Sequence, residues 1–190
     1  NQAFNGRAGQ IMKVAVLALQ GDFAEHIEVL KKLGAECFEL RQKADVQKDF
    51  DFLILPGGES TVQSKLLHDL DMFDILKQKI ESGIPVFATC AGLILLSMHF
   101  KTLPVTVRRN AYGRQLGSFY TQDDYGELHD VPMTFIRGPV IQSVDSDDVQ
   151  ILTKTGGNIV AVKYKNQTAV SFHPELNDDY RVYKDFLKIM

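Results

Sequence analysis

Short apolar blocks alternate with stretches of helical periodicity through the first half of the chain. The blocks are residues 14–19 (VAVLAL), 37–40 (CFEL), 52–55 (FLIL) and 85–89 (PVFAT). The run at residues 14–19 is continuous and is typical of a strand that is buried on both faces, as in a parallel sheet. The stretches between them place apolar residues three and four positions apart and predict helices over residues 22–33, 60–70, 72–81 and 91–97. This alternation predicts βαβ units.

Turn and capping residues lie where these elements should begin and end. Asp22 is in position to cap the first helix, and Gly34 to stop it. Residues 56–58 (PGG) break the third strand, and Gly83 ends the helix that precedes the fourth. A very short turn at Cys90 then connects the fourth strand to an apolar helix, a geometry that exposes a side chain.

The pattern changes from about residue 106 onward, where short β segments are separated by polar turns. We expect strands over residues 117–121, 133–136, 149–152, 159–164 and 168–172, added antiparallel to the central sheet, and a closing helix over residues 178–190. The predicted fold class is α/β: one domain with a mostly parallel central sheet flanked by helices and extra antiparallel strands in the second half. We expect this domain to cover residues 12–190, with residues 1–11 a cloning remnant or a disordered tail.

Composition and charge narrow the function classes. The chain has 190 residues, 45% of them hydrophobic, which is enough apolar material for a full core. With 21 Lys and Arg against 24 Asp and Glu, the net charge of −3 disfavours nucleic-acid binding. No apolar run is long enough to predict a membrane span. The two cysteines form no CxxC pair, so we expect neither a disulfide scaffold nor a metal site, and a cytoplasmic location.

Three motifs follow predicted strands, at the edge where open α/β sheets place their sites: residues 57–60 (GGES), 89–92 (TCAG) and 171–175 (SFHPE). The helix dipole and a nearby imidazolium favour the thiolate of Cys90. His173 and Glu175 are two apart, so in an extended segment the carboxylate can hold the ring for use as a base. Small residues permit close backbone approach, and the N–H groups of Gly57, Gly58 and Ala91 are candidates to bind an oxyanion.

Each motif also has an ordinary structural interpretation when taken alone. A cysteine at a strand–helix junction is commonly a small buried hydrophobe. A His-Pro-Glu segment is commonly a turn with a solvated carboxylate, and a Gly-Gly pair is commonly a loop that needs positive φ. The three motifs together, in this order and each at a strand end, favour a nucleophile, a base and an oxyanion site instead.

In these motifs the sequence resembles the class I glutamine amidotransferases; the matching residues are 55–61 (LPGGEST), 89–92 (TCAG) and 172–175 (FHPE). Residues 17–21 (LALQG), 105–115 (VTVRRNAYGRQ), 135–139 (FIRGP) and 171–176 (SFHPEL) resemble the glutaminase subunits of pyridoxal 5'-phosphate synthases in particular. The resemblance runs from about residue 12 to residue 190.

The resemblance implies that the chain hydrolyses L-glutamine to glutamate and ammonia with a triad of Cys90, His173 and Glu175, and without a cofactor. It implies a hetero-oligomeric complex with a synthase subunit that receives the ammonia, and low activity until that subunit docks. Glutamine is a zwitterion, so its site needs a cation, for which Arg109 and Arg137 are candidates, and an acceptor, for which Glu59 is a candidate. The positions that the family implies for the glutamine site are Gly58, Glu59, Ser60, Arg109, Ile136 and Arg137.

Two alternatives stay open at this point. The chain is the glutaminase of another ammonia-using synthase, although residues 108–115 (RRNAYGRQ) argue against this. Alternatively it is a non-catalytic subunit that binds and regulates a partner, although retention of Cys90, His173 and Glu175 together argues against that.

Overall fold

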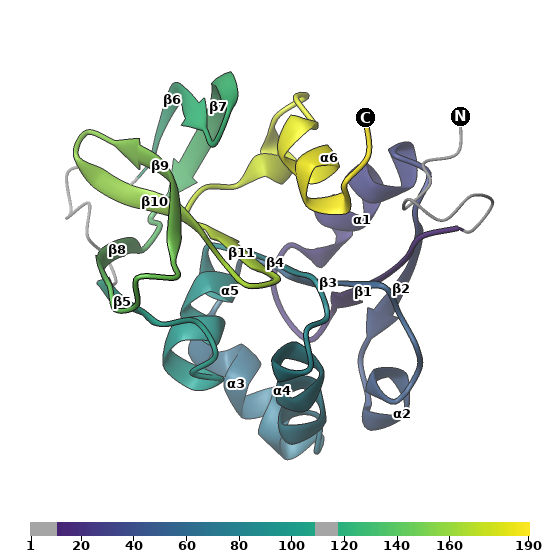
Figure 1. Ribbon diagram of the computed structural model, residues 1–190. Helices are drawn as coiled ribbons and strands as arrows, with labels where there is room; N and C mark the ends of the chain where they lie inside the picture. The colour runs from purple at the N-terminus through teal and green to yellow at the C-terminus, as the bar shows by residue number, and fades with distance from the viewer. Residues whose placement is uncertain (1–10, 109–117) are drawn as a thin grey trace.

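The computed structural model describes residues 11–108 and 118–190, which form an α/β fold (Figure 1). The strands are β1 Lys13–Leu17, β2 Glu36–Leu40, β3 Phe52–Leu55, β4 Val86–Thr89, β5 Val105–Arg108, β6 Ser118–Tyr125, β7 Leu128–Ile136, β8 Val140–Val144, β9 Gln150–Thr155, β10 Asn158–Tyr164 and β11 Gln167–Val170. The helices are α1 Phe23–Lys32, α2 Lys43–Val46, α3 Ser60–Asp69, α4 Phe73–Glu81, α5 Ala91–Ile94, the π-helix η1 Leu95–His99, the 3-10 helix η2 Pro174–Leu176 and α6 Arg181–Leu187.

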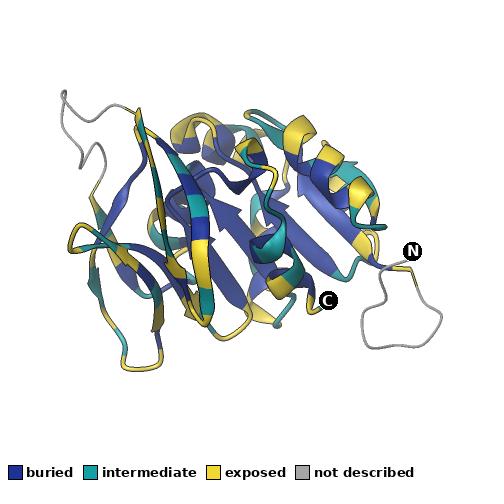
Figure 2. Ribbon diagram, turned by 90° about the horizontal axis from the view of Figure 1, so that it is seen from above, coloured by how far each residue is buried: buried dark blue, intermediate teal, exposed yellow. Residues whose placement is uncertain are grey.

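Within the described ranges, nine strands form the central sheet, in the order β2-β1-β3-β4-β11-β10-β8-β5 with β9 beside β10. The first five strands of this order run parallel. β1 is buried from Val14 to Leu17, as its continuous apolar run predicted, and β3, β4 and β11 are buried at every position (Figure 2). The prediction of a mostly parallel sheet is confirmed.

Helices cover both faces of the parallel part of the sheet. α1 and α6 lie on one face, and α3, α4 and α5 on the other (Figure 1). Each face has its own apolar core: Leu30 of α1 and Phe186 of α6 belong to one cluster, and Leu67 of α3 and Leu93 of α5 to the second. No helix of the described part of the chain is both long and apolar enough to cross a membrane.

The second half adds antiparallel strands, as predicted, but not all to the central sheet. β10, β8, β5 and β9 extend that sheet. Among the described residues, β6 and β7 instead pair with each other, in a separate two-stranded sheet. The segment expected at residues 168–172 is β11, which pairs antiparallel with β10, as predicted, and parallel with β4 on its other side.

Several element boundaries differ from the predicted ones. The helix expected at residues 91–97 is α for one turn and then continues as η1, where Ser97 Oγ bonds the carbonyl of Leu93. The helix expected at residues 178–190 is α6, which ends at Lys188 in the left-handed conformation. Asp22 occupies the N-cap position of α1 but makes no capping hydrogen bond, so the predicted cap is wrong. The short helix α2 and the strand β8 were not predicted.

Candidate active site

A pocket of ≈ 540 Å³ lies where β1, β3, β4 and β11 end. Because these four strands are parallel neighbours, the loops that follow them meet at one edge of the sheet. The pocket is lined by Gln20, Asp22, Gly57, Gly58, Glu59, Ser60, Cys90, Ala91, Ile94, Ile136, Arg137, Pro139 and His173. The structure therefore gathers the three sequence motifs around one cavity.

Cys90 occupies a tight turn between β4 and α5. Its φ of 51° is a left-handed conformation that residues other than glycine rarely adopt, and its amide donates to the carbonyl of Val170 at 2.8 Å. Two positions later, a side chain on Gly92 would lie 2.2 Å from the carbonyl oxygen of Leu55. The helix thus packs directly on β3, and this contact fixes the turn that presents the thiol.

His173 follows β11, and Glu175 lies in η2 just beyond it. His173 Nδ1 is 2.6 Å from Glu175 Oε1, so the predicted pair forms, but the segment is a 3-10 turn and not the extended strand that the spacing argument assumed. The segment is held by its backbone, because the amide of His173 donates to the carbonyl of Thr134 on β7 at 2.8 Å. The Glu175 side chain is fully buried behind the ring, so it supports His173 without facing the pocket.

Asp22 is a second carboxylate at the same ring nitrogen, with Oδ2 3.4 Å from His173 Nδ1. Sequence reasoning treated Asp22 only as a helix cap. Its position directly after the Gln20-Gly21 turn at the end of β1, four residues before His26 on α1, is the signal that could have placed it in the site.

The buried charges in this cluster perturb one another. Burial disfavours the charged ring of His173, but hydrogen bonds outweigh burial and raise its pKa well above 6.5; the partners are Asp22, Cys90 and Glu175. Burial raises the pKa of Glu175 to about 8. Burial also opposes the charged form of Asp22, yet hydrogen bonds to His173 and Glu175 hold its pKa below the usual range. The site is therefore built to hold a protonated imidazole against a carboxylate.

The Gly57-Gly58 turn is tied to the loop after β1. The carbonyl of Gly57 accepts a hydrogen bond from the amide of Asp22 at 3.2 Å, and a side chain on Gly57 would lie 2.8 Å from His173 Cε1. Gly58 has φ +149°, and Gln20 Oε1 accepts the amide of Glu59 at 2.7 Å. Only glycine fits this close approach of the two loops to the imidazole.

Of the residues expected around glutamine, five line the pocket: Gly58, Glu59, Ser60, Ile136 and Arg137. Glu59 and Arg137 are exposed, and Ser60 is buried. Arg137 follows β7 with a left-handed φ of 48° and has no ion-pair partner among the described residues. Arg109 lies outside the described residues. Cys37 lies in β2 with its thiol pKa raised by burial, and both cysteines are free.

Asp22, His26 and Glu175 form the one group of potential metal donors found in the described ranges, with donor atoms within 4.8 Å of one another. Asp22 and Glu175 each contact His173 through one oxygen, and His26 Nε2 lies 3.2 Å from Thr89 Oγ1. These are the contacts of a hydrogen-bonded network, and we propose no metal there. The absence of a cofactor stays a prediction.

Comparison with known proteins agrees with this geometry. The model of the SNO glutamine amidotransferase family matches residues 16–190. A protein of Desulfitobacterium hafniense named pyridoxal 5'-phosphate synthase subunit PdxT is 59% identical over 93% of this chain and 92% of its own length. A Haemophilus influenzae protein of the same name is 51% identical over 94% of this chain and 98% of its own length.

Solved structures show the same fold. A crystal structure of a glutamine amidotransferase superposes with a TM-score of 0.86 at 39% identity, covering 92% of this chain and 97% of that chain. The class I glutamine amidotransferase fold expected from the motifs is confirmed. The chain belongs to the SNO glutamine amidotransferase family, and its parallel strands bring Cys90 and His173 to one pocket, with Glu175 buried behind the imidazole.

Proposed function

We propose that this chain is the glutaminase subunit of a pyridoxal 5'-phosphate synthase, and that it hydrolyses L-glutamine to glutamate and ammonia for a synthase subunit in vitamin B6 biosynthesis. The observation that carries the proposal is the arrangement of the base. His173 lines the same pocket as Cys90, and its Nδ1 lies 2.6 Å from the buried carboxyl group of Glu175. The names of the relatives support the synthase as partner.

In the proposed reaction, Cys90 is the nucleophile. Its Sγ forms a bond to the side-chain amide carbon of glutamine, and the carbonyl oxygen becomes an oxyanion. The amides of Ala91 and of the Gly57-Gly58 turn are the groups we assign to that oxyanion. Ala91 is the first residue of α5, where a helix leaves its amides without intrahelical partners.

His173 moves the protons. The bond from Nδ1 to Glu175 leaves Nε2 for the thiol and the substrate. The imidazolium gives its proton to the leaving nitrogen, which departs as ammonia and leaves a thioester on Cys90. The neutral ring then takes a proton from water, hydroxide adds to the thioester carbon, and the thiolate leaves as glutamate forms. Glu175 orients the ring through both steps.

The substrate groups assigned to the pocket match the charges of glutamine. Arg137, exposed and without an ion-pair partner in the described part of the chain, is available for the α-carboxylate, and Glu59 for the α-ammonium. Gly58, Ser60 and Ile136 complete the walls that we assign to the side chain. Arg109 stays a prediction for the same carboxylate. We propose no metal and no organic cofactor for this chain.

The proposal also covers the extent of the domain and the cellular compartment of the protein. The match of the family model to residues 16–190, and the full burial of Met12 just before β1, support an amidotransferase domain over residues 12–190. The free thiols of Cys37 and Cys90 are compatible with a reducing compartment and support a cytoplasmic location.

The test is glutamate release from L-glutamine by the purified chain, alone and with a pyridoxal 5'-phosphate synthase subunit. We expect strong activity only with the synthase, loss of that activity in Cys90→Ala, and normal activity in the matched variant Cys37→Ala. Folded protein with an intact thiol that releases no glutamate in either condition would favour a regulatory subunit. Activation only by a different ammonia-using synthase would overturn the choice of partner.

A further inference from the structure

Two carboxyl groups, rather than one, lie against the Nδ1 side of His173. Glu175 Oε1 is 2.6 Å from Nδ1, and Asp22 Oδ2 is 3.4 Å from the same atom. They arrive from opposite ends of the chain, Asp22 from the loop after β1 and Glu175 from η2 after β11. A single carboxylate is enough to orient an imidazole, so the second one needs a physical explanation.

Helix capping does not explain Asp22. It occupies the N-cap position of α1, but its φ of −92° and ψ of 43° lie outside the extended conformation usual for a cap, and its side chain makes no capping bond. Its side chain is 25% exposed and lines the pocket, while Oδ1 is buried with no hydrogen-bond partner. A carboxylate held this way incurs a desolvation cost that only a nearby positive charge offsets.

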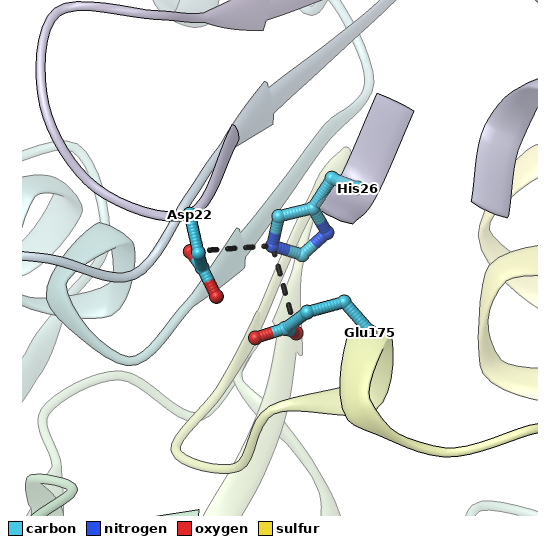
Figure 3. A group of neighbouring side chains, drawn as sticks. All are labelled: Asp22, His26 and Glu175. Atoms are coloured by element: carbon cyan, nitrogen blue, oxygen red, sulfur yellow. Dashed lines mark ion pairs between the residues drawn. The ribbon is translucent and has the colours of Figure 1, made fainter. Parts of the chain in front are cut away.

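Behind both carboxyl groups lies the fully buried imidazole of His26 (Figure 3). Its Nε2 is 3.6 Å from Glu175 Oε2 and 3.9 Å from Asp22 Oδ1, the two carboxyl oxygens that lack hydrogen-bond partners. Its Nδ1 is 2.8 Å from the hydroxyl of Tyr183. Because Nε2 lies near two carboxyl oxygens and the Thr89 hydroxyl, all of which can accept a hydrogen bond, we assign the ring proton to Nε2, with the Tyr183 hydroxyl donating to Nδ1.

Burial keeps His26 neutral, because it lowers the pKa of this ring to about 4. The positive charge that stabilises the Asp22 carboxylate is therefore that of His173. His26 stabilises the carboxylate only through the dipole of its N–H group. The titratable groups that face this cluster are His173 and Glu175 near η2, Tyr183 on α6, His26 on α1 and Cys90 after β4.

We propose that Asp22 is a positioning residue of the glutaminase: with Glu175 it brackets Nδ1 of His173 and stabilises the imidazolium, while the neutral ring of His26 faces the outer oxygens of both carboxyl groups. This rests on the proposed function. Asp22 acts through His173 and forms no bond to the substrate. The arrangement gives the base a second anion that stays ionised when the buried Glu175 takes up a proton.

Removing the negative charge of Asp22 should lower the pKa of His173. An opposite charge within about 4–6 Å raises the pKa of a histidine by about 1–3 units, and the partial exposure of Asp22 places the effect near the lower end. Asp22→Asn keeps the shape and removes the charge. We expect this variant to lower the pKa of His173 by about one unit, and to shift the alkaline limb of the kcat/KM profile to lower pH by the same amount. We also expect kcat to fall by a larger factor than KM rises.

The experiment combines an NMR titration of the imidazole groups in the free chain with the pH profile of glutamate release by the complex, for wild type, Asp22→Asn and Asp74→Asn. Asp74 is an exposed acid in the first turn of α4, so its variant removes the same charge at another helix start and should change neither readout. An unchanged His173 pKa in Asp22→Asn, or a rise in KM alone, would overturn the proposal. A wild-type complex without glutaminase activity would instead overturn the proposed function, because the NMR titration does not depend on turnover.

Discussion

The contact between Gly92 and β3 makes a quantitative prediction about how the nucleophile is held. An alanine at this position places its Cβ 2.2 Å from the carbonyl oxygen of Leu55, and relief to an ordinary contact of 3.4 Å requires α5 and β3 to separate by about 1.2 Å. The obstacle is backbone in the centre of the sheet, so the helix must move, and Cys90 is two residues from it. Gly92→Ala therefore displaces the thiol as well as straining the core.

The expected cost has two parts. Overpacking of this kind destabilises by about 1–3 kcal/mol, and about 2 kcal/mol lowers Tm by about 4–8 °C in a chain of this size. A displacement of about 1 Å at the reacting centre lowers kcat by about 100-fold. Gly156→Ala is the matched control: its Cβ meets nothing within 4 Å but its φ of +57° strains an alanine, so it costs about 1–2 kcal/mol without touching the site.

Both variants are assayed by glutamate release in the complex at saturating glutamine and by thermal unfolding. We expect comparable losses of stability and a fall in kcat only for Gly92→Ala. Wild-type kcat in Gly92→Ala would refute the argument that packing of α5 on β3 positions the nucleophile.

Three further outcomes are expected. Gln63→Leu removes amide bonds to the carbonyls of Gln20 and Pro56, so kcat should fall several-fold and stability by about 1–2 kcal/mol in urea unfolding; unchanged kcat would show that these bonds do not position the two loops. Tyr183→Phe leaves His26 Nδ1 without its partner, so the free energy of unfolding should fall by about 1 kcal/mol, and no loss would show that this hydrogen bond does not stabilise the fold. Folding lowers the pKa of His26 from 6.5 to about 4. As the pH drops from about 6.5 to 4, this histidine is therefore protonated in the unfolded chain but not in the folded one. The free energy of unfolding should fall by up to about 3 kcal/mol over this range because of His26. The raised pKa of Glu175 has the opposite effect on stability, so the comparison is between wild type and His26→Gln. The free energy of unfolding should fall less on acidification in His26→Gln than in wild type, and equal falls would contradict a neutral buried ring.

The sequence predicts most of the framework because its signals are local. The apolar runs that became β1, β3 and β4 are buried at nearly every position, which is what their composition indicated. The motif at Cys90 is likewise local, since strand, turn and helix are adjacent in the chain. His173 and Glu175 are close in the sequence, so their pairing could be predicted, although it is made in a 3-10 turn and not in an extended segment.

The rest depends on contacts between distant segments. Asp22 reaches His173 only because β1 and β11 end at the same edge of the sheet, a fact of strand order that no local pattern contains. The buried role of His26 requires Thr89 and Tyr183, which are 63 and 157 residues away along the chain. The separate β6 and β7 sheet was missed for the same reason, because alternation predicts a strand but not its partner.

The most direct test of the account is whether glutamine acylates Cys90. The chain and its synthase partner are mixed with L-glutamine, quenched in acid during turnover and digested for peptide mass spectrometry. The account predicts a γ-glutamyl thioester on the peptide that contains Cys90, none on the peptide that contains Cys37, and no adduct and no turnover in Cys90→Ala. Glutamate release by Cys90→Ala at the wild-type rate would contradict the central claim.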